Sequence, residues 1–372
     1  MKKKRSNYYT PQWNFSNKKR KKKKQKGSLK RFLLLLLLLL LCGAGSALYL
    51  LLRPAGIASK DAYIYITDTT SLERIFEQVE KGLVIRNPRI FRQVARLSHI
   101  EEGIRPGKYK LSPSQNMLQI ISEIKYGEQT PVRVQLKNAR TQQELILALT
   151  ENLQITPTEL SERLEDPTFC ATMGFDTITI RAIFTPSISS STIDKERAVY
   201  WNTSADSLIA YFKKRYDAFW TPERKKKAQQ EGFTPVEIIT IASIVQEESN
   251  KEEEHPIIAG LYINRLRKGI KLQADPTARY AVGDFTVKRI GKTHIRFDSP
   301  YNTYRVEGLP PGPICYPRES TIESVLNYTK HNYIFMCAKA DFSGFHAFAS
   351  TFEEHLKNAR LYQKELDRKN IR

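Results

Sequence analysis

One stretch of the sequence constrains the fold more than any other. Residues 32–52, FLLLLLLLLLCGAGSALYLLL, run for 21 positions without a charged side chain. At a rise of about 1.5 Å per residue, a helix of this length spans roughly 30 Å, the thickness of the hydrocarbon layer of a bilayer. The run therefore predicts a single transmembrane helix near the N-terminus.

Three other interpretations of this run fit less well. A cleaved signal peptide has a shorter apolar core, and although GAGSA resembles a cleavage site, the apolar run continues through residues 48–52. A lipid anchor at Cys42 normally follows small residues, whereas Leu40 and Leu41 precede this cysteine. A buried helix of a globular core fits poorly beside a strongly basic tail.

The positive charge of the chain is concentrated ahead of the apolar run. Residues 1–31 hold 14 of the 60 Lys and Arg residues and no Asp or Glu, which leaves 46 basic and 39 acidic groups elsewhere. Because positive flanks stay in the cytoplasm, we expect residues 1–31 to be a cytoplasmic tail that contacts anionic lipid, and everything after Arg53 to be exported. Nucleic acid is not an expected partner, because no folded reading module accompanies the lysines.

The cysteines do not form a disulfide framework. Cys42 lies in the apolar run, and Cys170, Cys315 and Cys337 are an odd number in the exported region. At most one pair can form, and the sequence does not specify which. The chain has no Cys-x-x-Cys and no His-x-x-x-His spacing, so we expect no zinc site, and nothing in the sequence calls for another metal or a cofactor.

Hydrophobic patterns divide the exported part into two regions. Residues 57–132 alternate strand-like runs, AYIYIT and GKYKL, with amphipathic helical runs, SLERIFEQVEKG, PRIFRQVARLS and SQNMLQIISEIKYG. This predicts a small α+β module. Residues 133–372 form a larger second domain, in which Thr141 and Glu144 occupy the positions of a capping box. The expected fold class is α+β.

A well-marked helix start precedes the sequence ITIASIVQEESN. Residues 234–237, TPVE, supply Thr as N-cap, Pro at the first helical position and Glu at the third. This fixes the register of the helix and places four residues on one face at spacings of three, four and three. They are Ile238, Ile241, Val245 and Glu248.

The two adjacent glutamates of this helix therefore have different expected environments. Glu247 lies roughly 150° from the apolar stripe, on a face with Thr240 and Ser243 that we expect to be solvated. Glu248 ends the stripe, where partial desolvation raises the pKa of a carboxyl toward the range that a general acid needs. The alternative is that Glu248 forms a structural ion pair with a Lys or Arg.

Several motifs that surround this helix occur together in one known family. The chain resembles the YceG-like (MltG-type) endolytic murein transglycosylases from the apolar run to about Leu361, and most strongly over residues 241–355. The last motif departs slightly, with Phe345 where the family has a second glycine before His346. The matching segments are SIVQEE at 243–248, NRL at 264–266, LQADPTARY at 272–280, YNTY at 301–304, GLPPGPI at 308–314 and GFHAF at 344–348.

The resemblance implies a fold, a place in the cell and a reaction. It implies a LysM-like module over 57–132 and a YceG-like catalytic domain over 133–372, held by one span in the bacterial inner (plasma) membrane. The implied substrate is the peptidoglycan glycan strand, with cell-wall synthases as further partners. It implies that Glu248, as single general acid and base, cleaves the MurNAc-GlcNAc β-1,4 bond and leaves a 1,6-anhydro end, without a cofactor.

Further site residues follow from the matching motifs and from their chemistry. Tyr301, Asn302 and Tyr304 are expected to hydrogen-bond or stack on sugars, and Gln273 and Asp275 to orient the substrate or the acid. Asp275 is equally suited to cap the helix that starts at DPT. His346 is a further substrate-binding candidate, with packing among aromatic residues as its alternative.

Two functions from different classes remain open on the sequence. The first is the lytic enzyme. The second is a catalytically silent, membrane-tethered scaffold that binds glycan strands beside the cell-wall synthases. A retaining or inverting hydrolase, with two carboxyl groups, is a weaker third possibility. Product analysis separates it, because only a lytic enzyme leaves anhydro ends.

Overall fold

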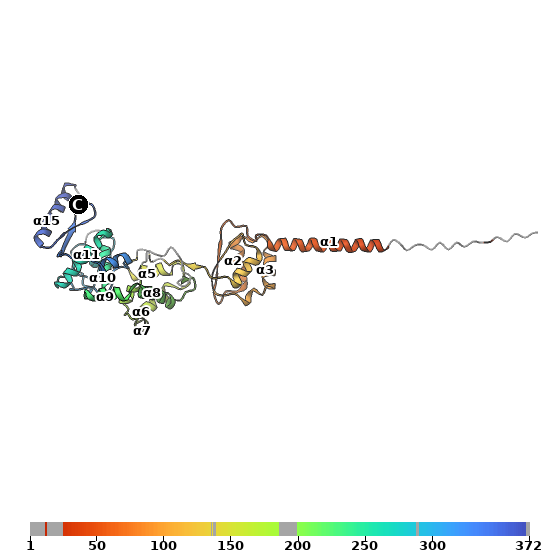
Figure 1. Cartoon of the computed structure of the whole chain (residues 1–372), viewed down its shortest axis with the longest axis horizontal. Helices are drawn as coiled ribbons and strands as arrows, with labels where there is room; N and C mark the ends of the chain where they lie inside the picture. The colour runs from red at the N-terminus through yellow and green to blue at the C-terminus, as the bar shows by residue number, and fades with distance from the viewer. Residues whose placement is uncertain are drawn as a thin grey trace, which may run out of the picture. The chain divides into compact units, whose positions relative to one another are not determined.

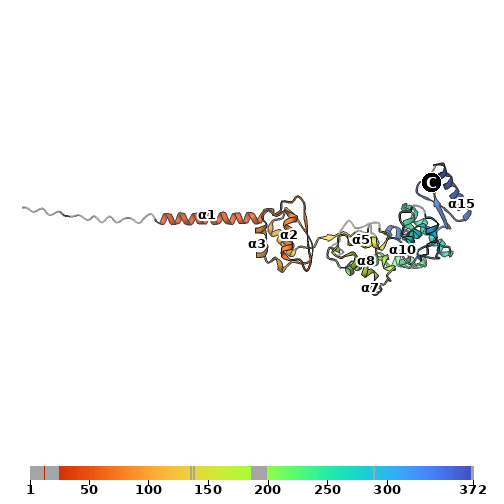
Figure 2. The same ribbon diagram turned by 180° about the vertical axis from the view of Figure 1, so that it is seen from behind.

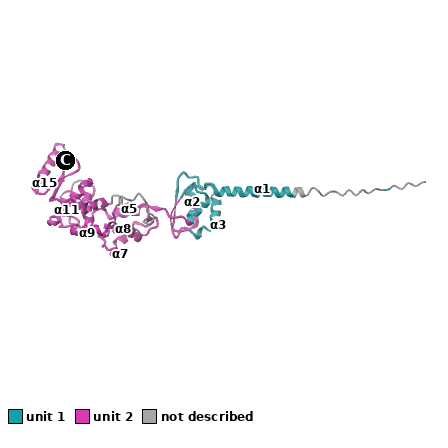
Figure 3. Ribbon diagram, viewed as in Figure 1, with its two compact units in different colours: residues 1–62, 79–103, 111–125 teal, residues 63–78, 104–110, 126–372 magenta. Residues whose placement is uncertain are grey.

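The computed structural model describes residue 12 and residues 25–134, 136, 139–185, 199–287 and 290–369 (Figure 1). The predicted basic tail, 1–31, therefore lies mostly outside the described residues. The chain divides into two compact units, one made of residues 1–62, 79–103 and 111–125, the other of 63–78, 104–110 and 126–372 (Figure 3). The described residues are predominantly helical, with short strands.

The predicted apolar span forms one uninterrupted helix, α1 (Gln25–Leu52), which is visible from both sides in Figures 1 and 2. Its leucines are exposed, for example Leu34 and Leu39, each with 67% of its surface accessible. Residues Leu29–Leu52 are the one helical segment of the described chain that is long and apolar enough to cross a membrane. The length and composition of this helix are consistent with a single-pass membrane anchor. A signal sequence would have the same length and apolar composition.

The region that follows α1 forms the elements that the sequence patterns predict. Strands β1 and β2 pair in a two-stranded sheet, and the helices between and after them are amphipathic. Ile64 and Ile66 of β1 and Phe91 of α3 are buried, as period-two and helical spacing require. The elements are β1 (Ala62–Ile66), α2 (Leu72–Leu83), α3 (Pro88–Leu97), η1 (Ile100–Glu102), β2 (Gly107–Leu111) and α4 (Met117–Tyr126).

The rest of the chain is a helical assembly with two further small sheets. Strand β3 (Pro131–Val132) pairs antiparallel with β4 (Val199–Tyr200). The predicted capping box at Thr141 and Glu144 is confirmed at the start of α5, where both reciprocal hydrogen bonds are present. The helices up to the centre of this unit are α5 (Gln142–Thr150), α6 (Pro157–Glu165), α7 (Pro167–Thr172), η2 (Thr179–Ile183), α8 (Ala205–Phe219), α9 (Pro222–Gln230) and α10 (Pro235–Glu248).

The C-terminal part continues this assembly and ends in a hairpin and a long helix. Strands β5 (Phe335–Ala338) and β6 (His346–Ala349) are antiparallel, with Cys337 opposite Ala347. The α15 helix packs against both strands. The remaining elements are η4 (Glu252–Glu254), α11 (His255–Arg267), α12 (Asp275–Val282), α13 (Lys292–Arg296), α14 (Glu319–Leu326) and α15 (Phe352–Arg368).

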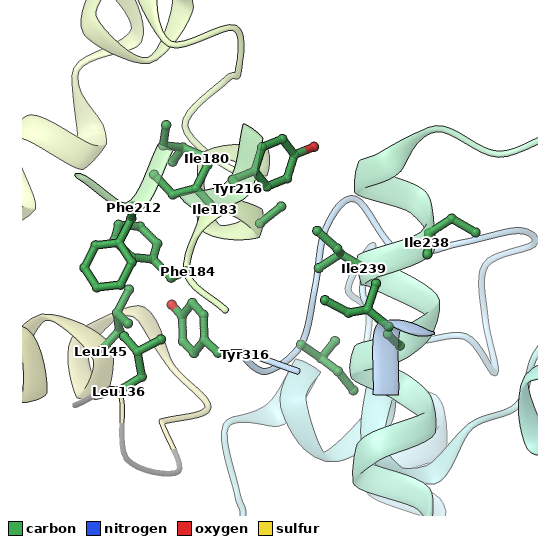
Figure 4. Close-up of a cluster of buried hydrophobic side chains, with 14 of the residues drawn as sticks. Leu136, Leu145, Ile180, Ile183, Phe184, Phe212, Tyr216, Ile238, Ile239 and Tyr316 are labelled. Atoms are coloured by element: carbon green, nitrogen blue, oxygen red, sulfur yellow. The ribbon is translucent and has the colours of Figure 1, made fainter. Parts of the chain in front are cut away.

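Helix α10 lies at the centre of the second unit and packs against α9, α11, α12, α14 and η2. Figure 4 shows Ile238 and Ile239 of this helix in the same apolar cluster as Tyr316 and Phe184, which come from other segments. Every residue from 238 to 245 is buried. A helix that is buried all round has no solvated face, so α10 is a core element.

The predicted solvated stripe of α10 is therefore wrong at two of its three positions. Thr240 and Ser243 are 2% and 0% exposed. The hydroxyl of Thr240 donates to the Val236 carbonyl, and the hydroxyl of Ser243 donates to the Thr240 carbonyl while it accepts from the Ile314 amide. These bonds satisfy both hydroxyl groups inside the core, which removes the cost of burying them.

Candidate active site

Glu248 is the last residue of α10, and the helix start fixes where it lies. The Thr234–Glu237 capping box forms both of its bonds, and Pro235 occupies the first turn, as predicted. Ser249 adopts an extended conformation and ends the helix. Because the helix is rigid and buried up to Val245, the backbone that carries Glu248 is held in a fixed place.

The side chain of Glu248 is partly accessible and has one direct side-chain partner among the described residues. The hydroxyl of Tyr262, on α11, donates to its Oε1 at 2.5 Å. No Lys or Arg forms an ion pair with Glu248 within the described part of the chain, so the structural ion pair considered for it is not found. Burial raises the pKa of Glu248 to about 7, and the charges of Asp275 and Glu247 act in the same direction. The Tyr262 hydrogen bond and the charge of Arg279 oppose this rise.

Glu247 has a different environment, although it precedes Glu248 directly. Its Oε2 lies 3.1 Å from Nε of Arg140, and its side chain keeps 21% of its surface accessible. The guanidinium of Arg140 in turn lies over the ring of Phe285. Glu247 is thus half-buried in an ion pair. The prediction that its side chain points freely to solvent is wrong.

Asp275 forms a second carboxyl-tyrosine pair near Glu248. The hydroxyl of Tyr304 donates to Oδ1 of Asp275 at 2.6 Å. The N-cap of α12 is Ala274 and no side chain caps this helix end, so the alternative that Asp275 is an N-cap is not supported. Burial, followed by the contact with Asp275, raises the pKa of Tyr304. Its hydroxyl therefore remains a proton donor at neutral pH.

Gln273 is exposed and lies in a strained backbone conformation. Its φ angle is +50°, in the left-handed region that side chains with a Cβ rarely adopt. Arg265, only 5% exposed, donates to Oε1 of Gln273 at 2.6 Å and to the backbone carbonyls of Lys271 and Ile334. The arginine of the NRL segment thus holds the loop that carries Gln273. Strained residues of this kind concentrate at functional sites.

Asn302 is fully buried and its amide is engaged by backbone groups. Its side-chain nitrogen donates to the carbonyls of His294, Ile295 and Phe297, and its Oδ1 accepts from the Tyr304 amide. An amide nitrogen has two N–H groups, so none remains for a ligand. The geometry gives Asn302 a structural role in the 294–304 loop, and gives the predicted sugar contact no support.

Tyr301 belongs to a group of aromatic residues around a buried arginine. Its ring centroid lies 4.9 Å from that of Tyr280. Arg181, 6% exposed, donates to the hydroxyl groups of Tyr280 and Tyr316. Burial raises the pKa of Tyr301. The half-buried position of Tyr301 leaves part of its ring available for a contact with a ligand.

His346 is connected to the end of α10 through Glu254. Both the backbone amide and Nδ1 of His346 bond to the Glu254 carboxylate, at 2.7 and 2.9 Å. The hydroxyl of Ser249 donates to the same carboxylate. Because Ser249 follows Glu248 directly, this network ties the β5–β6 hairpin to the backbone beside Glu248. His346 is therefore more than a packing residue, but its Nδ1 is occupied.

Comparison of the sequence with known protein families assigns the chain to one of them. The YceG-like family matches the chain over residues 64–361. The chain belongs to the YceG-like family. The matched range is much longer than the motif segments alone, and it includes every candidate site residue.

Curated relatives of this YceG-like chain share one name. The endolytic murein transglycosylase of Bacillus subtilis (strain 168) is 27% identical over 331 residues, which cover 86% of this chain and 90% of that protein. The protein of that name from Streptococcus pneumoniae (strain D39) is 31% identical over 157 residues, 41% of this chain and 27% of its own length. A crystal structure of a yceG-like protein from Listeria monocytogenes aligns with 81% of this chain and 99% of that chain, at 24% identity and a TM-score of 0.48.

Several residues near Glu248 were not predicted, because no pattern in the sequence marks them. Tyr262 follows Glu248 by fourteen positions on a different helix, and hydrophobic spacing marks it only as core. Glu254 lies in a run of three glutamates that resembles a solvated turn, yet it is 4% exposed. Arg279 carries a buried Nε–H that has no hydrogen-bond partner in the described part of the chain. Only the packing of α10, α11 and α12 brings such groups together.

No metal site accompanies these residues in the described ranges, where no group of three or more His, Cys, Asp or Glu side chains could hold an ion. Cys170 and Cys315 are buried free thiols, and Cys337 is a half-buried free thiol. Burial raises the pKa of the Cys315 thiol well above its ordinary value, which makes it unreactive.

Proposed function

We propose that this protein is a membrane-anchored endolytic murein lytic transglycosylase with Glu248 as its general acid and base. The proposal rests first on one observation: a partly accessible carboxyl, at the end of a buried helix, whose pKa burial raises to about 7. Family membership supports the reaction class, because the relatives from Bacillus subtilis and Streptococcus pneumoniae are named endolytic murein transglycosylases. The substrate is then peptidoglycan, and the enzyme is a lyase.

The proposed reaction needs only one carboxyl group. Protonated Glu248 gives its proton to the glycosidic oxygen between MurNAc and GlcNAc, and the C1–O bond breaks with its electron pair on that oxygen. The carboxylate then takes the proton of the MurNAc C6 hydroxyl while O6 bonds to C1. The products are a GlcNAc end and a 1,6-anhydro-MurNAc end, and Glu248 is protonated again. An acid with a pKa near neutral pH suits both steps.

The other candidate residues take supporting roles in this proposal. Asp275 stabilises the positive charge that develops at C1, since its negative charge already acts on Glu248. Tyr304 orients Asp275 through its hydroxyl group. Tyr301 and the exposed Gln273 contact the sugars. Asn302 shapes the loop between them, and His346 acts as a positioning residue through Glu254.

The remaining parts of the chain bring this site to its substrate. In the proposal, residues 1–31 stay in the cytoplasm against anionic lipid, residues 32–52 span the inner membrane, and the catalytic domain, 133–372, is exported. The strand-helix-helix-strand order within 57–132 supports the LysM-like assignment. Anchoring holds the site close to the membrane, where nascent strands and the cell-wall synthases lie.

One observation favours a second candidate, a hydrolase. Asp275 gives the site a second carboxyl whose charge acts on Glu248, and most glycosidases use a carboxyl pair. In that reaction water, rather than the C6 hydroxyl, attacks C1. The difference appears in the product, because hydrolysis adds an oxygen atom from solvent to the new end.

The test is product analysis in labelled water. The full-length protein in detergent is incubated with peptidoglycan strands in H₂¹⁸O, and the released glycans are measured by mass spectrometry. We expect 1,6-anhydro-MurNAc ends without ¹⁸O. Reducing ends that carry ¹⁸O would assign the hydrolase instead, and strands that bind but remain uncut would favour the glycan-binding scaffold.

A further inference from the structure

Among the described residues, the hydroxyl of Tyr262 makes the one side-chain hydrogen bond to the proposed acid. Tyr262 lies on α11, is 2% exposed and donates to Oε1 of Glu248 at 2.5 Å. Helix α11 packs against α10 and α14, and Tyr262 belongs to the buried apolar cluster of this unit. A buried tyrosine hydroxyl normally finds one partner, and here that partner is a carboxyl that must change its protonation state.

We propose that Tyr262 is a positioning residue that makes Glu248 a one-sided acid, by binding Oε1 and leaving Oε2 to carry the transferable proton. This inference rests on the proposed function, since it assigns a role within that reaction. In this proposal, each oxygen atom of the Glu248 carboxyl group has a separate role. Oε1 is the hydrogen-bond acceptor in every state, and Oε2 gives and takes the proton.

The chemistry of a carboxylic acid explains why one hydroxyl suffices. A protonated carboxyl has one O–H donor and one carbonyl oxygen, and the carbonyl oxygen is the better acceptor. A donor fixed at Oε1 therefore favours the form in which Oε1 is the carbonyl and Oε2 carries hydrogen. The proton is then held on the oxygen that Tyr262 does not cover.

The same contact also keeps the site ready for its second step. When Oε2 has lost its proton to the leaving oxygen, Tyr262 donates to a full carboxylate and stabilises it until the C6 hydroxyl returns a proton. Tyr262 keeps its own proton throughout, because burial and the neighbouring Glu248 raise the pKa of its hydroxyl well above its ordinary value. Tyr262 therefore exchanges no proton, and the overall balance of the reaction is unchanged.

The alternative is that Tyr262 only fills the core between α10 and α11. A pH profile separates the two roles. The Tyr262 hydrogen bond lowers the pKa of Glu248, so the substitution Tyr262→Phe, which keeps the ring, raises it. Because the free enzyme needs Glu248 protonated, we expect the limb on which kcat/KM falls with rising pH to move to higher pH. We also expect kcat at neutral pH to fall by about tenfold, with little change in KM.

The chain offers a matched control in a second tyrosine-glutamate pair. The hydroxyl of Tyr328 donates to Oε2 of Glu231 at 2.7 Å, and Tyr328 is similarly buried, at 9% exposed. Glu231 precedes the start of α10, whereas Glu248 ends it, and a helix of 14 residues is about 20 Å long. Tyr328→Phe loses a comparable hydrogen bond, so we expect it to leave the pH profile unchanged.

A direct titration makes the result independent of turnover. Full-length wild type, Tyr262→Phe and Glu248→Gln are labelled with ¹³C at the glutamate carboxyl groups, and the signal lost in Glu248→Gln is followed by NMR from pH 4 to 9. A higher pKa in Tyr262→Phe, together with the shifted pH limb, supports the positioning role. An unchanged pKa and an unchanged limb in folded Tyr262→Phe overturn it. If wild type cleaves nothing, the proposed function fails, while the titration still decides whether Tyr262 controls Glu248.

Discussion

Glu247 and Glu248 are adjacent in sequence and identical in chemistry, yet they meet opposite environments. Glu247 pairs with Arg140 at 3.1 Å, whereas Glu248 accepts from a tyrosine and has no ion pair in the described ranges. One step of about 100° around the helix axis separates them. Burial raises the pKa of Glu248 and so favours its protonated form, whereas Glu247 lies in an ion pair. The two glutamates therefore differ only in their position on the helix, which gives each a different environment.

This difference has a consequence for stability as a function of pH. The pKa of Glu248 is about 7 in the folded chain, against an ordinary value of 4.5. Between these values the unfolded chain has released the proton that the folded chain retains, so stability falls as pH rises through this window and is level above it. Glu248→Gln removes this loss. We expect the variant to gain up to about 3 kcal/mol over wild type above pH 7, and little below pH 4.5, in chemical unfolding.

The parallel variant Glu247→Gln serves as the comparison. It removes the charge from an ion pair rather than from a desolvated acid, so no gain at high pH is expected from it. Equal pH dependence in wild type and Glu248→Gln would contradict the raised pKa of Glu248.

Asn302 gives a second prediction at the scale of a residue. Its amide nitrogen donates to three backbone carbonyls of the 294–297 segment. Asn302→Ala removes these hydrogen bonds from a fully buried side chain, and we expect a loss of about 2–4 kcal/mol of stability, measured by thermal unfolding. The control is Asn327→Ala, whose amide donates to Glu323 at the exposed end of α14, with an expected change within about 0.5 kcal/mol. Normal stability of Asn302→Ala with weakened substrate binding would return Asn302 to the ligand-binding group.

The sequence predicted single residues well where periodicity carries the information. Glu248 ends an apolar stripe that the TPVE start places in register, and its raised pKa follows from that position. Tyr262 and Glu254 had no such marker, because the contacts that define them join separate helices. Residues that act through long-range packing leave no periodic signal in one sequence.

Helix boundaries were the most predictable feature at the scale of elements. The capping boxes at Thr141 and Thr234 form both of their hydrogen bonds, since such caps depend on neighbours three residues away. The face of α10 was less predictable. Thr240 and Ser243 look solvated by composition, but each hydroxyl bonds a carbonyl of the preceding turn, which allows it to be buried.

The contact between α11 and the segment after α14 gives a prediction for one element. Thr329 and His331 lie against α11, and a Cβ added at Gly260 would lie 2.4 Å from the Thr329 carbonyl oxygen. Alanine favours an isolated helix by about 1 kcal/mol over glycine, but crowding costs about 1–3 kcal/mol in a packed core. We expect Gly260→Ala to destabilise the chain, measured as a lower Tm. A higher Tm would mean that helix propensity prevails and that the contact is loose.

For the molecule as a whole, the proposed membrane anchor can be tested by its response to salt. A lysine-rich tail alone would bind anionic lipid electrostatically, and salt screens such binding. An inserted helix of 21 apolar residues is unaffected by salt. We expect the full-length chain to stay with membranes in 1 M NaCl and to be released only by detergent.

Two outcomes of that fractionation would contradict the anchor. Release by salt would mean that only the basic tail holds the chain, and an N-terminus that begins after residue 47, found by mass spectrometry, would mean that a signal peptide is cleaved. Deletion of residues 2–31 provides the control, because it removes the electrostatic contribution and leaves α1 intact.

The sequence patterns predict an apolar helix, a small α+β region and a larger α+β domain, in that chain order. Each element predicted in 57–132 is present, since short alternating and amphipathic runs are local signals. The boundary between compact units was not predictable. The chain crosses this boundary five times between residues 62 and 126, because a unit is defined by contacts rather than by chain order.

The central claim is that Glu248, and not Glu247, is the acid and base of a lytic transglycosylase. The most direct measurement compares full-length wild type, Glu248→Gln and Glu247→Gln on peptidoglycan, with released glycans read by mass spectrometry. We predict 1,6-anhydro-MurNAc ends from wild type and Glu247→Gln, and a loss of at least about 100-fold in Glu248→Gln. Undiminished anhydro product from folded Glu248→Gln would contradict the account.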